Sequence, residues 1–408
     1  MLFALALILG AAEAGPADAG RYTFDGAMPR EVLESYLSRA MTTMDLLTGR
    51  GDVDDNLRML RETGVKFAGR SLYLWGGEQH LGDKLHRASQ IEPKLHALDP
   101  EMILQAGIFE IVTTQVETVA VPAWVFEEFG LPVEARNFDY EAMLFRDGKF
   151  RDHWNDGASV PDMSQLETRM WFYYLARRYI DAGCEAIHFG QVALIGAADP
   201  GHGHWWDMLS RVRRYAKSHA RRHFVLCDAH TPHGGPRYGG DKLLFDFHSF
   251  PLRIKEVQGE PQRGVLEVGY LDSIYGRSNG GMTPSGWRCE HLPYLVELDN
   301  WGRSGKEGQY TGAFWCWGYD EIVWFAHQPA AYRAEWLRYA WDWVREHDPN
   351  GFLQMPGSRC LAVPVTLDDG TEAHWYFANR RSEAVPAGFG DEDAIRAIWK
   401  PEGPPVAR

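Results

Sequence analysis

The chain has 408 residues, with 42 Lys and Arg against 56 Asp and Glu, and its formal net charge is −14. Hydrophobic residues make up 45% of the chain, which is enough for a sizeable core and excludes a disordered protein. The acidic balance argues against nucleic acid and anionic membranes as partners, because phosphate binding relies on clustered Lys and Arg.

The first residues form a short apolar run. Residues 2–9, LFALALIL, lead to small residues at Ala12-Glu13-Ala14, which is typical of the apolar region and cleavage site of a secretory signal. The run is too short to span a bilayer, which takes about 20 residues, and no later segment is apolar for that long. We expect a signal peptide over residues 1–14, no membrane span, and a secreted or periplasmic location.

Apolar runs alternate with amphipathic helical segments along most of the chain. The predicted strands cover residues 40–47, 65–75, 101–112, 185–191, 223–230, 242–249, 264–270 and 310–318. Such alternation indicates a parallel sheet, and eight units over about 310 residues suit a (β/α)8 TIM barrel. A doubly wound open sheet is the alternative, but no G-x-G-x-x-G follows the first strands.

Two segments depart from this alternation. The stretch 113–162 is too long for an ordinary loop, so we expect either a wall over the active face or a structural insertion. Residues 351–408 contain two alternating runs around the turn Asp368-Asp369-Gly370 and no helical period. The predicted fold is therefore α/β, with a barrel over residues 20–350 and a small β-rich C-terminal appendage over 351–408.

Active sites of TIM barrels lie at the C-terminal ends of the strands, so polar residues there are the first candidates. The candidates on the first five predicted strands, in chain order, are Arg70, Trp75, Glu110, His188, Gln191, Asp228 and His230. The sixth predicted strand carries Asp246 and His248. Residues two apart on a strand share a face, so each of these D-x-H units forms a same-face pair. The alternative is a buried hydrogen-bond network that stabilises the barrel mouth.

The last two predicted strands add a carboxylate and aromatic side chains. Glu267 stands in the otherwise apolar run GVLEVGY, which ends at Tyr270, and Trp315 and Trp317 lie in GAFWCWG. Facing inward, Glu267 would have a shifted pKa and could act as a nucleophile or base. Facing outward, it would be a salt-bridged surface residue. We expect the inward position, because helices cover the outside of a parallel barrel.

The run EAIHFGQ on strand four, Glu267 on strand seven and GAFWCWG on strand eight resemble the layout of TIM-barrel glycoside hydrolases. In the large retaining clan of that fold, strand four ends in an acid/base Glu and strand seven carries the nucleophile Glu. The resemblance assigns the nucleophile to Glu267. The strand-four position is occupied by Gln191, which is not an acid, so the acid falls to Glu110, Asp228 or Asp246.

A secreted glycan-active enzyme, most simply a glycoside hydrolase, accounts best for these residues. Glycoside cleavage needs two carboxyl groups across the scissile bond. It requires no cofactor, and its partner would be an oligo- or polysaccharide that stacks on Trp75, Trp315 and Trp317 and bonds to Arg70, His188, Gln191, His230, His248 and Tyr270.

Two alternatives remain open at the level of sequence. A metal-dependent sugar isomerase or lyase would use Asp228, His230, Asp246, His248 and Glu267 as ligands, although none of these residues belongs to an H-x-H or H-E-x-x-H motif. A non-catalytic carbohydrate-binding barrel would explain Gln191 in the position of an acid.

Overall fold

The computed structural model describes residues 20–312 and 314–400, so the predicted signal peptide at residues 1–14 lies outside the described residues. Eight parallel strands form a closed ring, because the first strand pairs with both the second and the eighth. The ring consists of β1 (Ala40–Thr43), β2 (Phe67–Leu74), β3 (Ile103–Ile108), β6 (Ala186–Gln191), β7 (Leu226–His230), β10 (His248–Pro251), β15 (Tyr294–Glu297) and β16 (Gly351–Thr366). The predicted (β/α)8 barrel is confirmed.

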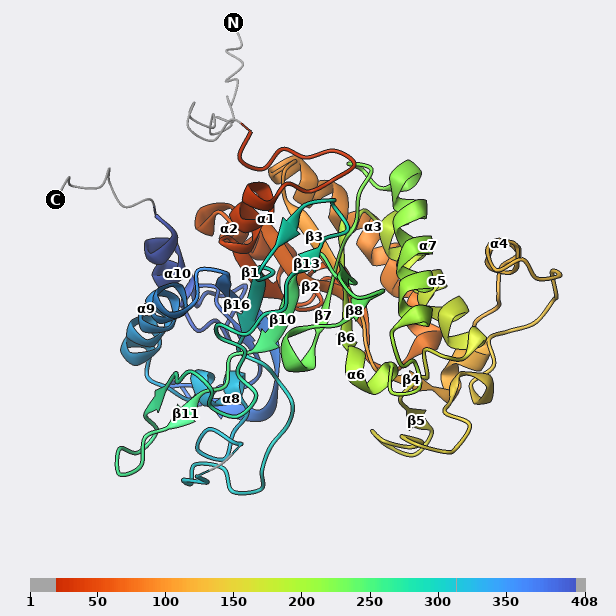
Figure 1. The fold of residues 1–408 in the computed structure, drawn as a ribbon. Helices are drawn as coiled ribbons and strands as arrows, with labels where there is room; N and C mark the ends of the chain where they lie inside the picture. The colour runs from red at the N-terminus through yellow and green to blue at the C-terminus, as the bar shows by residue number, and fades with distance from the viewer. Residues whose placement is uncertain (1–19, 313, 401–408) are drawn as a thin grey trace, which may run out of the picture.

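One strand lies outside the ring. β17 (Glu372–Phe377) pairs antiparallel with β16, and its last residue joins Ser358 in register. This is the small β addition expected at the C-terminal end, although the barrel itself continues past residue 350 into β16. α10 (Glu392–Trp399) follows β17 and packs beside the helix that precedes β16 (Figure 1).

Helices cover the ring unevenly. The helical layer consists of α2 (Val53–Thr63), α3 (Leu81–Leu98), α5 (Leu166–Asp181), α7 (Gly203–His219), α8 (Glu321–Ala326) and α9 (Ala330–His347), with the short α4 (Ala123–Glu128) and α6 (Val192–Ile195) at its edge. In the described chain, β7–β10 and β10–β15 are connected without an α-helix. Small strands take their place: β8 (Arg237–Tyr238), β9 (Lys242–Leu243), β11 (Lys255–Glu256), β12 (Gly264–Val265), β13 (Gly281–Met282) and β14 (Arg288–Cys289).

The segment 113–162 runs between β3 and α5. It contains α4 and the two-residue strands β4 (Val112–Thr113) and β5 (Ala158–Ser159), which pair antiparallel. Short 3-10 turns occur here and elsewhere, at Leu46–Thr48, Glu78–His80, Thr114–Thr118, Glu141–Met143 and Pro232–Gly234. None of the described helices is both long and apolar enough to cross a membrane.

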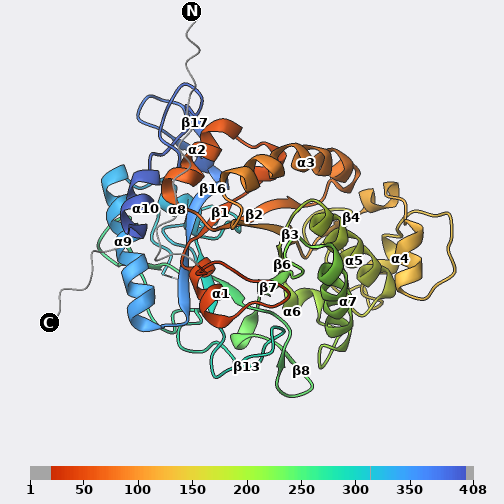
Figure 2. The same ribbon diagram turned by 90° about the horizontal axis from the view of Figure 1, so that it is seen from above.

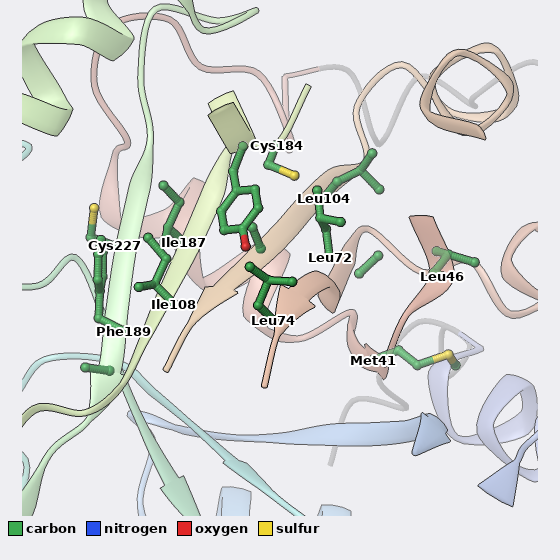
Figure 3. Packing of buried hydrophobic residues seen from close by; sticks show 14 of the residues in the cluster. Met41, Leu46, Leu72, Leu74, Leu104, Ile108, Cys184, Ile187, Phe189 and Cys227 are labelled. Atoms are coloured by element: carbon green, nitrogen blue, oxygen red, sulfur yellow. The ribbon is translucent and has the colours of Figure 1, made fainter. Parts of the chain in front are cut away.

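The main core lies between the strands and the helices. Leu104 and Ile108 of β3 and Ile187 and Phe189 of β6 point outward into it, as strand periodicity requires (Figure 3). The alternate residues, such as Gln105 on β3 and His188 on β6, point into the barrel. The alternating faces of β3 and β6 therefore separate a hydrophobic shell from the barrel interior.

The N-terminal end of the barrel is closed by α1 (Arg30–Leu37) and the residues before it, which lie across the ring in Figure 2. Tyr22, Phe24 and Tyr36 from this segment pack on the first inward residues of the strands, including Phe67 and Leu226. These apolar side chains form the floor of the barrel.

Two residues further along each strand, the inward side chains become polar. This layer consists of Thr42, Gly69, Gln105, His188, Asp228, Ser249, Glu297 and Gln354. Gly69 has no side chain because a Cβ there would lie 2.1 Å from Nε2 of Gln354. A polar layer in this position makes the upper part of the barrel the place where charged chemistry is possible.

The predictions for the last three strands need correction. β10 overlaps only the end of the predicted strand 242–249, and the predicted strands 264–270 and 310–318 are wrong. Residues 264–270 supply only β12, which pairs with β11 in an outer ribbon. Residues 310–312 and 314–318 lie in a loop whose Trp317 is buried against that ribbon, with its Nε1 2.9 Å from the carbonyl oxygen of Arg263.

Candidate active site

A cavity of about 1160 Å³ opens at the C-terminal ends of the barrel strands. Ligand pockets in proteins usually enclose about 300–1000 Å³, so this one has room for an oligosaccharide. Its charged, imidazole-bearing and amide-bearing lining residues are Arg70, Glu110, Gln191, His230, His233, Arg253, Asp272, Arg277, Asp299, Asn300 and Arg359. They come from strand ends and from the loops that follow them, which is the place of the active site in TIM-barrel enzymes.

Glu297, the last residue of β15, lies directly under this cavity and is held on several sides. Nη1 of Arg359 lies 2.6 Å from its Oε2, and Nε2 of His230 lies 3.1 Å from its Oε1. Arg70 donates to both carboxylate oxygens, with Nε 3.3 Å from Oε2. The side chain of Glu297 is only 2% exposed, so these contacts replace its hydration.

The charges around Glu297 fix its protonation state. Burial alone would raise the pKa of Glu297, but Arg359, Arg70 and the hydrogen bond from His230 outweigh burial and hold that pKa well below its usual range. Glu297 is therefore a carboxylate at every pH at which the protein is expected to work. An ionised carboxylate under a sugar-sized cavity can act as a nucleophile or a base.

Arg70 reaches Glu297 because β2 is irregular at this point. The register between β2 and β3 shifts between Ala68 and Leu72, and Arg70 has a φ of 58°. Its backbone N–H donates to Oε1 of Gln105 at 3.0 Å instead of to the strand ladder. Bulges commonly redirect a side chain in this way next to active sites.

Glu110 follows β3 and lies on the cavity wall beside the end of β6. Its Oε2 accepts from the backbone N–H of Gln191 at 2.8 Å, and its Oε1 accepts from the Gln191 side chain at 2.8 Å. The other two lining carboxylates, Asp272 and Asp299, are each paired with an arginine. Of the lining carboxyl groups, Glu110 is thus the one that forms no ion pair in the described chain.

The first D-x-H unit is confirmed as a same-face pair. Asp228 is fully buried, with Oδ2 2.7 Å from Nδ1 of His188 and Oδ1 2.7 Å from Nε2 of Gln105, while His230 above it lines the cavity. Burial, together with Arg70, lowers the pKa of His188 to about 4, so its ring is neutral near pH 7. Asp228 and His188 therefore support the site from below rather than line it.

The second D-x-H unit lies on the opposite face of its strand. Oδ2 of Asp246 accepts from the backbone N–H of Cys227 at 2.9 Å and from Arg213 of α7 at 3.1 Å. His248 lies 3.2 Å from the hydroxyl of Ser278, and burial lowers its pKa to about 3. The inward positions on this stretch belong to Phe247 and Ser249, and neither Asp246 nor His248 lines the cavity.

The predicted nucleophile is also displaced. Glu267 lies after β12 on the outer ribbon, its side chain is 50% exposed, and its Oε2 accepts from Nζ of Lys255 at 2.6 Å. It is a salt-bridged surface residue, and the expected inward position is wrong.

The five residues of the alternative metal site are thus dispersed. Within residues 20–312 and 314–400, no group of three or more His, Cys, Asp or Glu side chains is arranged so that it could hold a metal ion.

We expect Glu267→Gln to leave activity within about twofold of the wild-type value and stability within about 0.5 kcal/mol, because surface substitutions rarely exceed that. Measurements of kcat/KM and Tm on the purified variant check both. A loss of activity beyond tenfold would restore Glu267 as a site residue.

Aromatic side chains form two separate parts of the cavity wall. Trp75, 47% exposed, meets Trp154 from the insertion edge to face at a centroid distance of 5.0 Å. Trp301 and the 42% exposed Phe314 meet at 4.4 Å on the loop after β15. Exposed rings on two sides of a cavity suit the C–H faces of sugars.

The other predicted aromatic positions lie outside the lining. Trp315 stacks on the back of Trp301 at 3.9 Å, and Trp317 is buried in the loop. Tyr270 lies beside Lys255 on the outer ribbon. Glu256 of β11 fixes this loop, since its carboxylate accepts from the backbone N–H groups of Gly312 at 2.6 Å and Trp317 at 2.7 Å.

Glu321 is a buried carboxyl group at the start of α8, next to the cavity wall. It accepts from the backbone N–H groups of Leu252 at 3.2 Å, Arg253 at 2.6 Å and Asp299 at 3.0 Å. Burial raises the pKa of Glu321 to about 7, although Arg253 opposes the rise. Burial likewise raises the pKa of the neighbouring Asp320 to about 7.

The raised pKa of Glu321 predicts a pH-dependent stability. The folded protein binds a proton that the unfolded chain releases, so this contribution is complete below about pH 4.5 and is lost as the pH rises to about 7. The shift corresponds to about 3 kcal/mol. We expect Glu321→Gln, which resembles the protonated form, to reduce the fall of Tm between pH 5 and 8.

Thermal unfolding followed by circular dichroism at pH 5, 6, 7 and 8 measures this fall. The exposed Glu335 of α9 provides the matched control, and Glu335→Gln should keep the wild-type slope. An unchanged slope in Glu321→Gln would show that this carboxyl group does not titrate in that range.

Several residues of the site were not predicted from the sequence. Glu297, Asp299 and Trp301 stand in YLVELDNW, which reads as part of a long loop because only three apolar residues precede Glu297 in it. Arg359 lies in the segment predicted as the appendage. The signal was present in both places as a polar residue within or directly after a short apolar run.

No protein-family model matches the chain, and no curated protein matches it. Similar solved structures include the GH113 beta-mannanase of Alicyclobacillus acidocaldarius, with 13% identity over 88% of this chain and 96% of that one, at a TM-score of 0.38. The alpha-galactosidase of Thermus thermophilus has 15% identity over 49% of this chain and 44% of its own, at a TM-score of 0.29. The isomalto-dextranase of Arthrobacter globiformis T6 has 12% identity over 68% and 48%, at 0.36. The assignment of the barrel rests on the strand pairing.

Proposed function

We propose that the chain is a glycoside hydrolase that binds an oligo- or polysaccharide in the cavity at the C-terminal end of the barrel. The observation that carries the proposal is the ionised Glu297 under a cavity of about 1160 Å³ that aromatic rings line on two sides. Glycoside cleavage needs this combination in chemical terms: a permanent carboxylate, a second carboxyl group and surfaces on which sugars stack.

The two carboxyl groups have different roles in this proposal. Glu297 stabilises or attacks the positively charged sugar carbon, because Arg70 and Arg359 keep it ionised. Glu110 donates the proton to the leaving oxygen, since it lines the cavity without an arginine partner. His230 contacts Glu297 from the cavity side, where it can also bond to a substrate hydroxyl.

The acid role of Glu110 has a direct test. We expect Glu110→Gln to lower kcat/KM at least 100-fold on glycosides with poor leaving groups, because general acid catalysis contributes about 10²–10⁴-fold. Aryl glycosides with acidic leaving groups need little protonation, so their rates should fall much less. Steady-state kinetics on both substrate types measure the difference.

The exposed Glu117 of the insertion is the matched control, and Glu117→Gln should retain the wild-type rates on both substrate types. Equal losses on both types in Glu110→Gln would contradict the acid role. Tight oligosaccharide binding by wild-type protein, with no product from any glycan, would instead favour the non-catalytic carbohydrate-binding barrel.

Export is a separate part of the proposal. The apolar run at residues 2–9 and the small residues at 12–14 support a secreted or periplasmic enzyme, which would meet polymeric glycans outside the cytoplasm. N-terminal sequencing of the protein recovered after expression of the full chain tests this, and an intact Met1 would count against a cleaved signal.

A further inference from the structure

Four arginines line the cavity, and one of them differs from the others. Arg70 and Arg359 pair with Glu297, and Arg253 pairs with a rim carboxylate. Arg277 donates only to the backbone carbonyl of Ser273, and no carboxylate pairs with it in the part of the chain that the structure describes. Its remaining guanidinium donors are free to bind a ligand.

The charge of the cavity is unlike that of the protein. The chain has a net charge of −14, yet the lining contains the four arginines against three carboxyl groups, Glu110, Asp272 and Asp299. The lining itself therefore has one more arginine than carboxyl groups. A neutral glycan gives no reason for an uncompensated arginine in the cavity of an acidic protein.

The loop that carries Arg277 is held in place by its neighbours. The backbone N–H of Asn279 donates to the carbonyl of Gly234 at 2.8 Å, and its side chain donates to the carbonyl of Gly235 at 2.8 Å. The same side chain donates at 3.1 Å to the carbonyl of His233, whose ring also lines the cavity. Arg277 and His233 thus stand on two joined loops of one rim.

We propose that Arg277, with His233 beside it, binds an anionic group of the substrate, so that the enzyme acts on acidic glycans that carry carboxylate or sulfate groups. A guanidinium bonds to either group through two parallel N–H donors, which fixes orientation as well as charge. Asp272 lies on the same rim and is 66% exposed, but Arg253 neutralises it. The inference rests on the proposed function, since it names the substrate class of the same cavity.

The test compares matched acidic and neutral glycans. Affinity electrophoresis of wild-type protein in gels containing dextran sulfate or dextran isolates the sulfate group, and polygalacturonate or alginate against mannan tests the carboxylate. We expect at least one acidic polymer to bind about 10-fold or more tightly than its neutral counterpart, and Arg277→Gln to remove that difference. The exposed Arg303, which lies outside the lining, provides the control variant Arg303→Gln with unchanged retardation.

Either of two binding results would overturn the inference: acidic polymers bound no more tightly than neutral ones, or equal retardation of the Arg277→Gln and wild-type proteins. Hydrolysis of a neutral glycan with the same kcat/KM as its acidic counterpart would also overturn it, while leaving the glycoside hydrolase intact. Conversely, binding of acidic polymers through Arg277 without cleavage of any glycan would refute the hydrolase and retain the anion site.

Discussion

Replacement of Glu297 by glutamine is expected to lower kcat/KM by about 10³-fold or more, because the variant keeps the shape of the side chain and loses its permanent charge. Arg70 and Arg359 would then face an amide instead of a carboxylate. Addition of sodium azide to Glu297→Ala should restore part of the turnover and form a glycosyl azide, since azide fits the space of the missing carboxylate. Product analysis by NMR identifies this adduct.

Loss of activity in Glu297→Gln must be separated from loss of the fold. Near-ultraviolet circular dichroism of the variant should match the wild-type spectrum, and the surface variant Glu267→Gln should be fully active under the same conditions. Activity within tenfold of wild type in a folded Glu297→Gln would remove Glu297 from the reaction and leave it as a structural ion pair.

Arg359→Met is expected to lower the free energy of unfolding by about 3–5 kcal/mol, because it removes one of the two arginines that pair with the buried Glu297 and the arginine that pairs with Asp299. Nη1 of Arg359 lies 2.6 Å from Glu297 and Nη2 lies 2.6 Å from Asp299, and both Arg359 and Glu297 are almost fully buried. Urea denaturation at pH 7 measures the loss.

The sign of the pH dependence follows from Glu297. Its lowered pKa contributes stability that is present above the ordinary glutamate range and is lost as the pH falls through the folded-state pKa. Without Arg359 the pKa of Glu297 rises, so Glu297 takes up its proton at a higher pH in the variant than in the wild type. The difference in the free energy of unfolding between the two proteins should therefore become smaller as the pH falls from 7 towards 4.5. Arg303→Met, an exposed control, should change stability by less than about 0.5 kcal/mol at either pH.

The first five barrel strands could be predicted because each is followed by an amphipathic helix or preceded by one. The predicted runs 40–47, 65–75, 101–112, 185–191 and 223–230 contain β1, β2, β3, β6 and β7. After β7 this alternation ends, since the described chain has no α-helix between β7 and β15. Two strands of four residues each then carry too little periodicity to compete with the more apolar runs in the outer ribbon and its loop.

The site shows the same division. Arg70, Glu110 and Gln191 line the cavity as predicted, because their strands were located correctly and strand ends converge in a barrel. Glu267 stands in the apolar run GVLEVGY, which predicts a buried strand, whereas Glu297 is not among the candidates, and sequence alone does not reveal which run is paired on both sides. The predicted inward pair Asp246 and His248 is displaced by one residue, because the inward residues are Phe247 and Ser249. Ser249 donates its hydroxyl to Asp228.

The sealed floor under the polar layer gives the barrel interior a single route for exchange with solvent. Tyr22, Phe24 and Tyr36 exclude water from below, so hydrogen–deuterium exchange within the layer around Asp228 and His188 proceeds through the cavity mouth. A glycan bound in the cavity would then close this route for the whole barrel interior. Its binding is then expected to slow exchange at strand amides that it does not contact, and this protection would report occupancy even with a glycan that is not cleaved.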